Sequence, residues 1–194
     1  MNTTADYINA LMRDRNDYEK KLNDYGIEVH NLTFTEMNKK IRIPMMEGLS
    51  FAWAKEKTLD YETSILDTSG IENFSSVFYR CNNITSLNLS HWNMSSAKNL
   101  GGMFYWCVNL VSVDVSNWDV SNVTSMKHMF YQCDNLSNQS VQNICNMCIN
   151  AVNMPVKNLH PSNFESPLIY TEKYIENIVD AETLNKLRLG GWTW

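Results

Sequence analysis

The chain has 194 residues, of which 44% are hydrophobic, and a formal net charge of −5. This length suits one domain or one capped solenoid, and the hydrophobic content is enough for a core, which argues against global disorder. The chain has no cluster of Lys and Arg, which argues against nucleic acid and anionic membranes as partners. No apolar stretch approaches the ~20 residues of a membrane span, and the N-terminus lacks the basic start and apolar run of a secretory signal.

Residues 1–44 are predicted to form an N-terminal helical anchoring element. We expect an amphipathic helix over 4–25, where apolar residues recur at steps of three and four, and a short helix over 33–41, which Pro44 ends. The stripe of the first helix could pack on its own chain, or it could seat a partner helix or a second copy. The expected assembly residues of this helix are Ile8, Leu11, Tyr18 and Leu22.

Residues 45–65 are interpreted as a transition and N-terminal cap. Leu59, Tyr61 and Ile65 are spaced as in a short strand. The stretch lacks the Phe, Cys and Asn of the repeat that follows it. It should therefore lie before the first full copy of that repeat.

A pattern with a fixed period, equal to the step from Phe78 to Phe104, recurs over 66–140. A period of this length is typical of stacked supersecondary units and not of an ordinary globular core. Residues at equivalent positions should face one interior row, and the cysteines should be small hydrophobes and not a disulfide framework. The residues expected to form this structural repeat core are Phe78, Phe104, Phe130, Cys81, Cys107, Cys133, Asn83, Asn109, Asn135, Trp92 and Trp118.

Each unit is predicted to run as strand, turn, helix, turn. Leu87 and Leu89 alternate with polar residues, as in a strand with one buried face. Ser121 is placed to N-cap a helix whose apolar face is spaced by three and four residues. That face would carry Val123, Met126, Met129, Phe130 and Cys133.

Residues 141–194 are interpreted as a C-terminal cap and tail. A helix over 181–189 is expected, and Trp192 and Trp194 could either dock within the chain or bury themselves in a neighbouring subunit. We take both as candidate assembly residues. A first helical stripe should close the open end of the repeats, through Val141, Ile144, Cys145, Cys148, Ile149 and Val152.

No residue pattern selects a catalytic or metal site. Cys145 and Cys148 form a C-x-x-C, but a zinc site needs a second ligand pair, and two cysteines three apart on a helix share one face. The four histidines occupy different positions within the repeat, and the chain has no phosphate-binding glycine loop. We therefore predict no catalytic residue, no metal, no cofactor and no enzymatic activity. A glycan-active enzyme stays an alternative, because scattered glutamates could include an acid pair.

A row of aromatic residues is the candidate binding surface. Tyr79, Tyr105 and Tyr131 each follow the repeat Phe, so they should lie at the rim or on the outer face, and Trp106 adds a ring in the middle copy. These rings could bind a sugar or a protein, or they could simply stabilise the stacking of the copies.

The repeat written F-x-x-C-x-N-[IL]-x-S-[LV]-[ND]-[LV]-S-x-W, over 66–136, resembles the 26-residue repeat of bacterial surface proteins, a BspA-like relative of leucine-rich repeats. The resemblance implies an α/β repeat fold, a short right-handed leucine-rich-repeat-like solenoid. About three coils of short parallel strand plus helix would lie between N-terminal helices and a C-terminal helical cap.

The flanking segments are similar to those of phage minor structural and tail-associated proteins, through Asp6-Tyr-Ile-Asn-Ala-Leu at the start and Gly191-Trp-Thr-Trp at the end. The expected function is thus a structural or interaction protein of a phage virion, in the tail, the baseplate or the head. Its partners would be other virion proteins or a second copy, with a host surface glycan or protein as ligand and no membrane insertion. The alternative is a bacterial cell-surface or secreted adhesin of the same repeat family.

Overall fold

The structure is a computed structural model, and it describes residues 43–44, 50–52, 63, 66–159 and 175–194. The helices predicted over 4–25 and 33–41 lie outside the described residues, and so do the expected assembly residues Ile8, Leu11, Tyr18 and Leu22. The bounds of the four predicted segments stay predictions. The described elements are β1 (Ile43–Pro44), β2 (Leu66–Asp67), β3 (Ser86–Asn88), β4 (Ser112–Asp114), α5 (Asn138–Ile149), the 3-10 helix η1 (Ile175–Asn177) and α6 (Ala181–Leu189).

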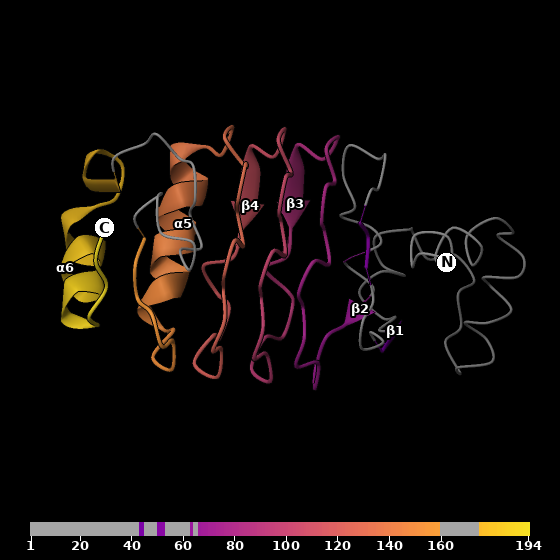
Figure 1. Cartoon of the computed structure of the whole chain (residues 1–194), viewed down its shortest axis with the longest axis horizontal. Helices are drawn as coiled ribbons and strands as arrows, with labels where there is room; N and C mark the ends of the chain where they lie inside the picture. The colour runs from indigo at the N-terminus through magenta and orange to yellow at the C-terminus, as the bar shows by residue number, and fades with distance from the viewer. Residues whose placement is uncertain (1–42, 45–49, 53–62, 64–65, 160–174) are drawn as a thin grey trace, which may run out of the picture.

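Stretches of chain that are one repeat apart lie side by side in parallel. Strand β1 pairs with β2, and β3 pairs with β4 in a register that joins Leu87 to Val113. Parallel bridges link Asn73 to Asn99 and Asn99 to Ser125 on another side of the molecule. Figure 1 shows the successive stretches next to one another along the long axis. We call each such stretch a layer.

The helix expected within each repeat is not formed in residues 66–137, which make turns, bridges and short strands instead. Alternate amide N–H groups donate to the next layer, as from Phe78 to the Met103 carbonyl (2.8 Å) and from Arg80 to the Tyr105 carbonyl (2.7 Å). The N–H groups between them donate three residues back. An α-helix would need all of these groups for bonds within its own segment, so bonding between layers replaces it.

A stack of phenylalanine rings runs through the core. Neighbouring rings in the series Phe51, Phe78, Phe104 and Phe130 have centroids 5.4, 5.3 and 4.8 Å apart and planes within 9° of parallel. The step along the chain from Phe51 to Phe78 is longer by one residue than the step from Phe78 to Phe104. This position corrects the interpretation of 45–65 as a stretch without the repeat Phe, because Phe51 occupies that row one layer earlier.

Buried cysteine and tryptophan side chains tie each layer to the one before it. The Sγ atoms of Cys81, Cys107 and Cys133 donate to the preceding layer's Phe carbonyl at 3.0–3.1 Å. The indole N–H of Trp92 donates to the Thr63 carbonyl, and the equivalent group of Trp118 donates to the Leu89 carbonyl. The carbonyls of Phe78, Phe104 and Leu89 also accept a main-chain N–H three residues further along their own layer, so each of these side-chain bonds adds a second donor that comes from the next layer.

The asparagine row of the repeat lies at the surface, where its side chains bond the main chain at one corner of the stack. Asn83, Asn109 and Asn135 are exposed. The side-chain amide of Asn109 donates to the Asn82 carbonyl of the preceding layer, and Asn135 bonds Val108 in the same way, both at 2.7 Å. The row therefore stabilises one corner of the stack through hydrogen bonds.

Helix α5 closes the stack at its C-terminal end. Ser137 caps the helix by accepting from the Ser140 N–H. The Ser140 hydroxyl accepts from the Val113 N–H (3.0 Å) and donates to the Val111 carbonyl (3.1 Å). One hydroxyl thus serves main-chain groups of strand β4 that another strand would otherwise pair with.

The stripe predicted for this helix is confirmed at its inner positions, since Val141, Ile144, Cys145 and Cys148 are buried. Val152 lies beyond the end of the helix and is 60% exposed.

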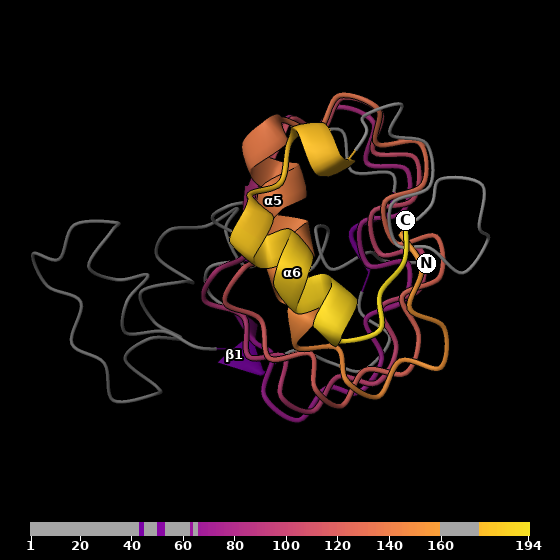
Figure 2. The ribbon, with the colours of Figure 1, turned by 90° about the vertical axis from the view of Figure 1, so that its left-hand side faces the viewer.

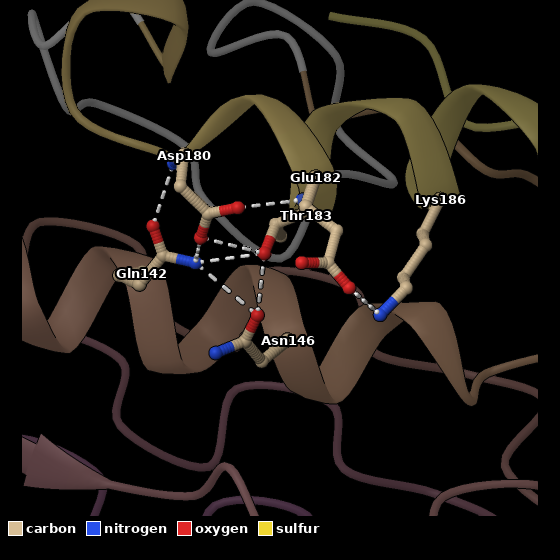
Figure 3. A network of polar contacts seen from close by, with 6 residues as sticks. All are labelled: Gln142, Asn146, Asp180, Glu182, Thr183 and Lys186. Carbon is tan, nitrogen blue, oxygen red and sulfur yellow. Dashed lines mark hydrogen bonds and ion pairs between the residues drawn. The ribbon is translucent and has the colours of Figure 1, made fainter.

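Helix α6 covers α5, and its bounds confirm the helix predicted over 181–189. Seen from the α6 end, the layers lie one behind another, with α6 across α5 in front of them (Figure 2). Figure 3 shows the polar contacts between the two helices. Gln142 accepts from the Asp180 N–H (2.9 Å), and its amide nitrogen donates to the Asp180 carboxylate (2.6 Å) and the Thr183 hydroxyl (2.9 Å).

Candidate recognition surface

The three repeat tyrosines form one stacked row at the edge of the layers. Tyr79, Tyr105 and Tyr131 are each half-buried and directly follow a core Phe. Their ring centroids are 5.1 and 4.7 Å apart, with planes within 12° of parallel. Both faces of the Tyr105 ring are therefore covered by its neighbours, and the ring presents its edge and hydroxyl outward.

A second row, one residue later in each layer, consists of Arg80, Trp106 and Gln132. The Arg80 guanidinium lies over the Trp106 ring at 4.0 Å from its centroid and over the Tyr79 ring at 5.6 Å. At these distances the guanidinium makes cation–π contacts, which restrain the position of the Arg80 side chain. Together we call Tyr79, Tyr105, Tyr131, Arg80, Trp106 and Gln132 the aromatic rim.

The backbone beneath the second row is left-handed. Arg80, Trp106 and Gln132 have φ values of 54°, 60° and 58°. For residues with a Cβ atom this conformation costs roughly 1–2 kcal/mol each. Glycine would fit better at all three positions, but the chain places large side chains there.

His128 lies edge-on to the tyrosine row. Its ring centroid is 6.1 Å from that of Tyr105 and 5.5 Å from that of Tyr131, in both cases nearly perpendicular. Burial and the neighbouring Tyr131 and Tyr79 raise the pKa of Tyr105, while Arg80 opposes that shift. The Tyr105 phenol therefore stays protonated at neutral pH and can donate a hydrogen bond.

The middle of the rim holds polar groups that form no hydrogen bond with the described residues. Within that part of the chain, the Tyr105 hydroxyl and the Gln132 amide make no hydrogen bond, and the indole N–H of Trp106 is buried without an acceptor. Elsewhere in the layers, side-chain amides and indoles bond main-chain carbonyls. The rim departs from this rule.

The thiols of the described chain are structural. None of the five cysteines is in a disulfide, and all five are buried. Burial raises the pKa of Cys145 to about 12, and burial together with Cys145 raises that of Cys148 well above the ordinary value. Protonated, inaccessible thiols make poor nucleophiles and metal ligands. Among the described residues, no group of three or more metal-binding side chains comes together.

The two terminal tryptophans dock on their own chain. Trp192 is 3% exposed and belongs to the core, which is the first of the two arrangements expected for it, docking within the chain. Trp194 donates from its indole N–H to the Glu176 carboxylate (2.6 Å), and the Arg188 guanidinium lies 4.9 Å from its ring centroid. The C-terminal tail therefore packs back against its own chain, at η1 and α6.

Sequence reasoning placed the four aromatic residues of the rim in register but did not predict the roles of Arg80, Gln132 and His128. Arg80 and Gln132 occupy the Trp106 position in the neighbouring layers, so the repeat step was a signal for both. His128 occupies the position of Gly102 and Ser76, and nothing in its neighbours along the chain indicates that its ring turns toward tyrosines.

The family described as "Mycoplasma protein of unknown function, DUF285" matches residues 46–165, which is more than half of the chain. Comparison with curated proteins and with solved structures gives no match. No helix within the described ranges is both long and apolar enough to span a bilayer.

Proposed function

Because the chain belongs to the DUF285 family, which is associated with BspA-like repeats, we propose that it is a non-enzymatic binding protein whose aromatic rim is a recognition surface. The observation that carries this proposal is the rim itself. It combines left-handed backbone, a guanidinium over an indole, and the Trp106 indole N–H, which has no acceptor among the described residues. A purely structural aromatic ladder would need none of these.

The fold class that goes with this function is the short right-handed leucine-rich-repeat-like solenoid. Its support is the parallel register of Ser86–Asn88 on Ser112–Asp114 and the equivalent bonds that recur in each layer. In a solenoid each unit contacts only its neighbours, so a row of equivalent side chains forms a continuous strip on one face. The tyrosine row would be such a strip.

The proposed setting is a phage virion, in which the protein would bind other virion proteins or a second copy of itself and present the rim to a host surface glycan or protein. The similarity of both flanks to phage tail-associated proteins supports this setting. A bacterial cell-surface adhesin is the second candidate, and membership of a family associated with BspA-like surface repeats favours it.

Locating the protein distinguishes the two settings. Mass spectrometry of purified phage particles and of surface-exposed proteins from intact host cells, released by brief protease treatment, would be compared in one culture. We expect peptides of this chain in the particles. Recovery only from the cell surface would favour the adhesin, and absence from both fractions would contradict the proposed function.

A further inference from the structure

Three phenols stand next to one another in the tyrosine row, Tyr79, Tyr105 and Tyr131. Neighbouring ring centroids are 5.1 and 4.7 Å apart, and the ring planes lie within 12° of parallel. Because the rings are equivalent in successive layers, the carbon atoms beside each hydroxyl group lie next to the same atoms of the adjacent ring. Two tyrosines that couple by oxidation join through these carbons. The row therefore holds side by side the atoms that such coupling joins.

The main chain keeps the three rings in this arrangement. The N–H groups of Tyr79, Tyr105 and Tyr131 each donate to the carbonyl three residues back, at 3.1, 3.0 and 3.2 Å. The carbonyls of Tyr105 and Tyr131 accept from the N–H groups of Arg80 and Trp106 in the preceding layers, both at 2.7 Å. Rotation of the side chains alone can then bring two neighbouring rings into contact. Groups held in this way react as a pair within one molecule, at an effective concentration far above that of the protein.

The Tyr105 hydroxyl has no task in the packing of the described residues. It makes no hydrogen bond with them, and a phenylalanine ring would stack equally well. The ring is half-buried with its hydroxyl outward, so a proton lost from the phenol passes to water. Trp106 stands beside it with ring centroids 6.3 Å apart, close enough for an indole that loses an electron to regain it from the phenol. The competing thiols and the Trp92 and Trp118 indoles are buried, so oxidation reaches the tyrosine row before it reaches them.

We propose that the tyrosine row is a site of oxidative cross-linking, in which Tyr105 forms a carbon–carbon bond with Tyr79 or with Tyr131. The resulting dityrosine ties two adjacent layers covalently, where the structure otherwise joins them by hydrogen bonds and packing. This role goes beyond recognition and does not depend on which ligand the rim binds.

The oxidant is hydrogen peroxide acting through a haem peroxidase. Each of the two phenols loses one electron and one proton, and the two phenoxyl radicals join through the carbons beside their oxygens. The hydrogens on those carbons then move to the oxygens and restore both phenols. One peroxide molecule takes up the two electrons and the two protons and leaves as two molecules of water.

The test treats the full chain, in dilute solution, with hydrogen peroxide and a haem peroxidase, and maps dityrosine by mass spectrometry of tryptic peptides. Trypsin leaves the three tyrosines in separate peptides, 58–80, 99–127 and 128–157. We expect cross-linked pairs that join 99–127 to either of the other two, with a yield that about tenfold dilution of the protein leaves unchanged. Fragment ions distinguish Tyr79 from Tyr61 within the first peptide.

Tyr105→Phe is the decisive variant, because it keeps the stacked ring and removes the phenol that both pairs share. It should lose the cross-link between layers, whereas Tyr79→Phe and Tyr131→Phe are matched controls that should each keep the pair that remains. Treatment should raise the Tm of the unaltered chain by about 5 °C or more, because a covalent link between distant residues restricts the unfolded chain. The Tm of Tyr105→Phe should not change.

The proposal is overturned if no dityrosine forms, if Tyr105→Phe keeps the cross-linked peptides, or if Tyr79 joins Tyr131 as often as either joins Tyr105. It is also overturned if the product consists of separate chains joined to one another, with a yield that falls on dilution. None of these outcomes bears on whether the protein is recovered from particles or from cell surfaces, so the proposed function is tested separately.

Discussion

The backbone at Gly102 is left-handed, with a φ of 61°, and the equivalent residues Ser76 and His128 share this conformation. A Cβ atom at Gly102 would meet the Ser76 hydroxyl at 3.6 Å, so the space is adequate and the cost is conformational. We predict that Gly102→Ala lowers the free energy of unfolding by about 1 kcal/mol, and that Ser76→Gly raises it by roughly 0.5 kcal/mol.

Urea unfolding followed by circular dichroism measures both changes. One substitution adds a Cβ atom and the other removes one, at equivalent positions of adjacent layers. Each therefore serves as the control of the other. If both shift stability in the same direction, the left-handed backbone is not the cause.

The buried thiols make stability depend on alkaline pH. Cys145 has a pKa of about 12 in the folded chain against about 8.5 when unfolded, so the folded state keeps the proton more tightly. The stabilisation is fully present below about pH 8.5 and is lost as pH rises toward 12, by about 1.4 kcal/mol per pH unit for each such thiol. Urea unfolding at pH 7 and at pH 9.5 should show this loss. Cys145→Val should reduce the loss by one thiol's share, and an unchanged slope would contradict it.

At the scale of elements, the Ser140 hydroxyl takes the place of a further strand at the last layer, where it bonds the main chain of Val111 and Val113. Ser140→Ala would leave the buried Val113 N–H without its acceptor, so we predict a destabilisation of about 1–3 kcal/mol. Hydrogen exchange at Val113 should accelerate in the same variant. Gln139→Ala, on the exposed side of α5, is the control and should change stability by less than about 0.5 kcal/mol. Equal effects of the two substitutions would show that the hydroxyl does not cap β4.

The contact of α6 with α5 depends on Gln142. Its amide joins the Asp180 backbone and carboxylate to the Thr183 hydroxyl, at the N-cap of α6. Gln142→Ala should therefore weaken the packing of α6 and of Trp192 on α5, while the layers stay intact. Hydrogen exchange would rise over 181–192 and stay unchanged over 86–114. A uniform rise across both segments would mean instead that the whole molecule unfolds as one unit.

The two C-terminal helices could be predicted because their signals are local. Ser137 and Asp180 stand at the N-caps, and apolar residues follow at helical spacing. The segments between the strands gave the same spacing through Val123, Met126 and Met129, which are indeed buried, but not on a helix. The N–H groups of Val123 and Met129 donate three residues back, and the Met129 carbonyl accepts from the Phe104 N–H of the preceding layer. A pattern along one stretch of chain cannot report a partner that lies a whole repeat away.

For the candidate site, the sequence could predict which residues form a row but not how their side chains contact one another. The period of the repeat puts Tyr79, Tyr105 and Tyr131 in one row, because equivalent positions of stacked units share a face. Which ring faces are covered, and that Arg80 lies on Trp106, depend on side-chain geometry across layers. Phe51 could not be recognised from the fixed period, because its layer contains one extra residue. The interval from Phe51 to Thr63 is one residue longer than the equivalent interval from Phe78 to Leu89.

At the scale of the whole molecule, a stack of equivalent layers should tolerate the loss of one layer. Deletion of residues 86–111 removes one full repeat and joins Thr85 to Ser112, which is the counterpart of Ser86 in the next layer. We predict a folded, shorter protein with a cooperative thermal transition, because each remaining layer meets an equivalent neighbour. Deletion of 87–111, one residue fewer, leaves an extra residue within the joined strand and turns the side chains next to it away from the core, so this variant should be less stable than the first. Small-angle scattering and thermal unfolding followed by circular dichroism would compare the two, and equal stability of both would contradict the repeat register.

The hydroxyl that ends the ladder at Ser140 also bears on how such chains can change length over evolution. Apart from the Ser137 hydroxyl at the cap of its own helix, it bonds the layer directly before it, through Val111 and Val113. An in-frame duplication upstream would present α5 with an identical last layer and leave this terminus unaltered. Relatives with many more copies could therefore share one closing helix, and the number of layers would be free to follow the length of the ligand.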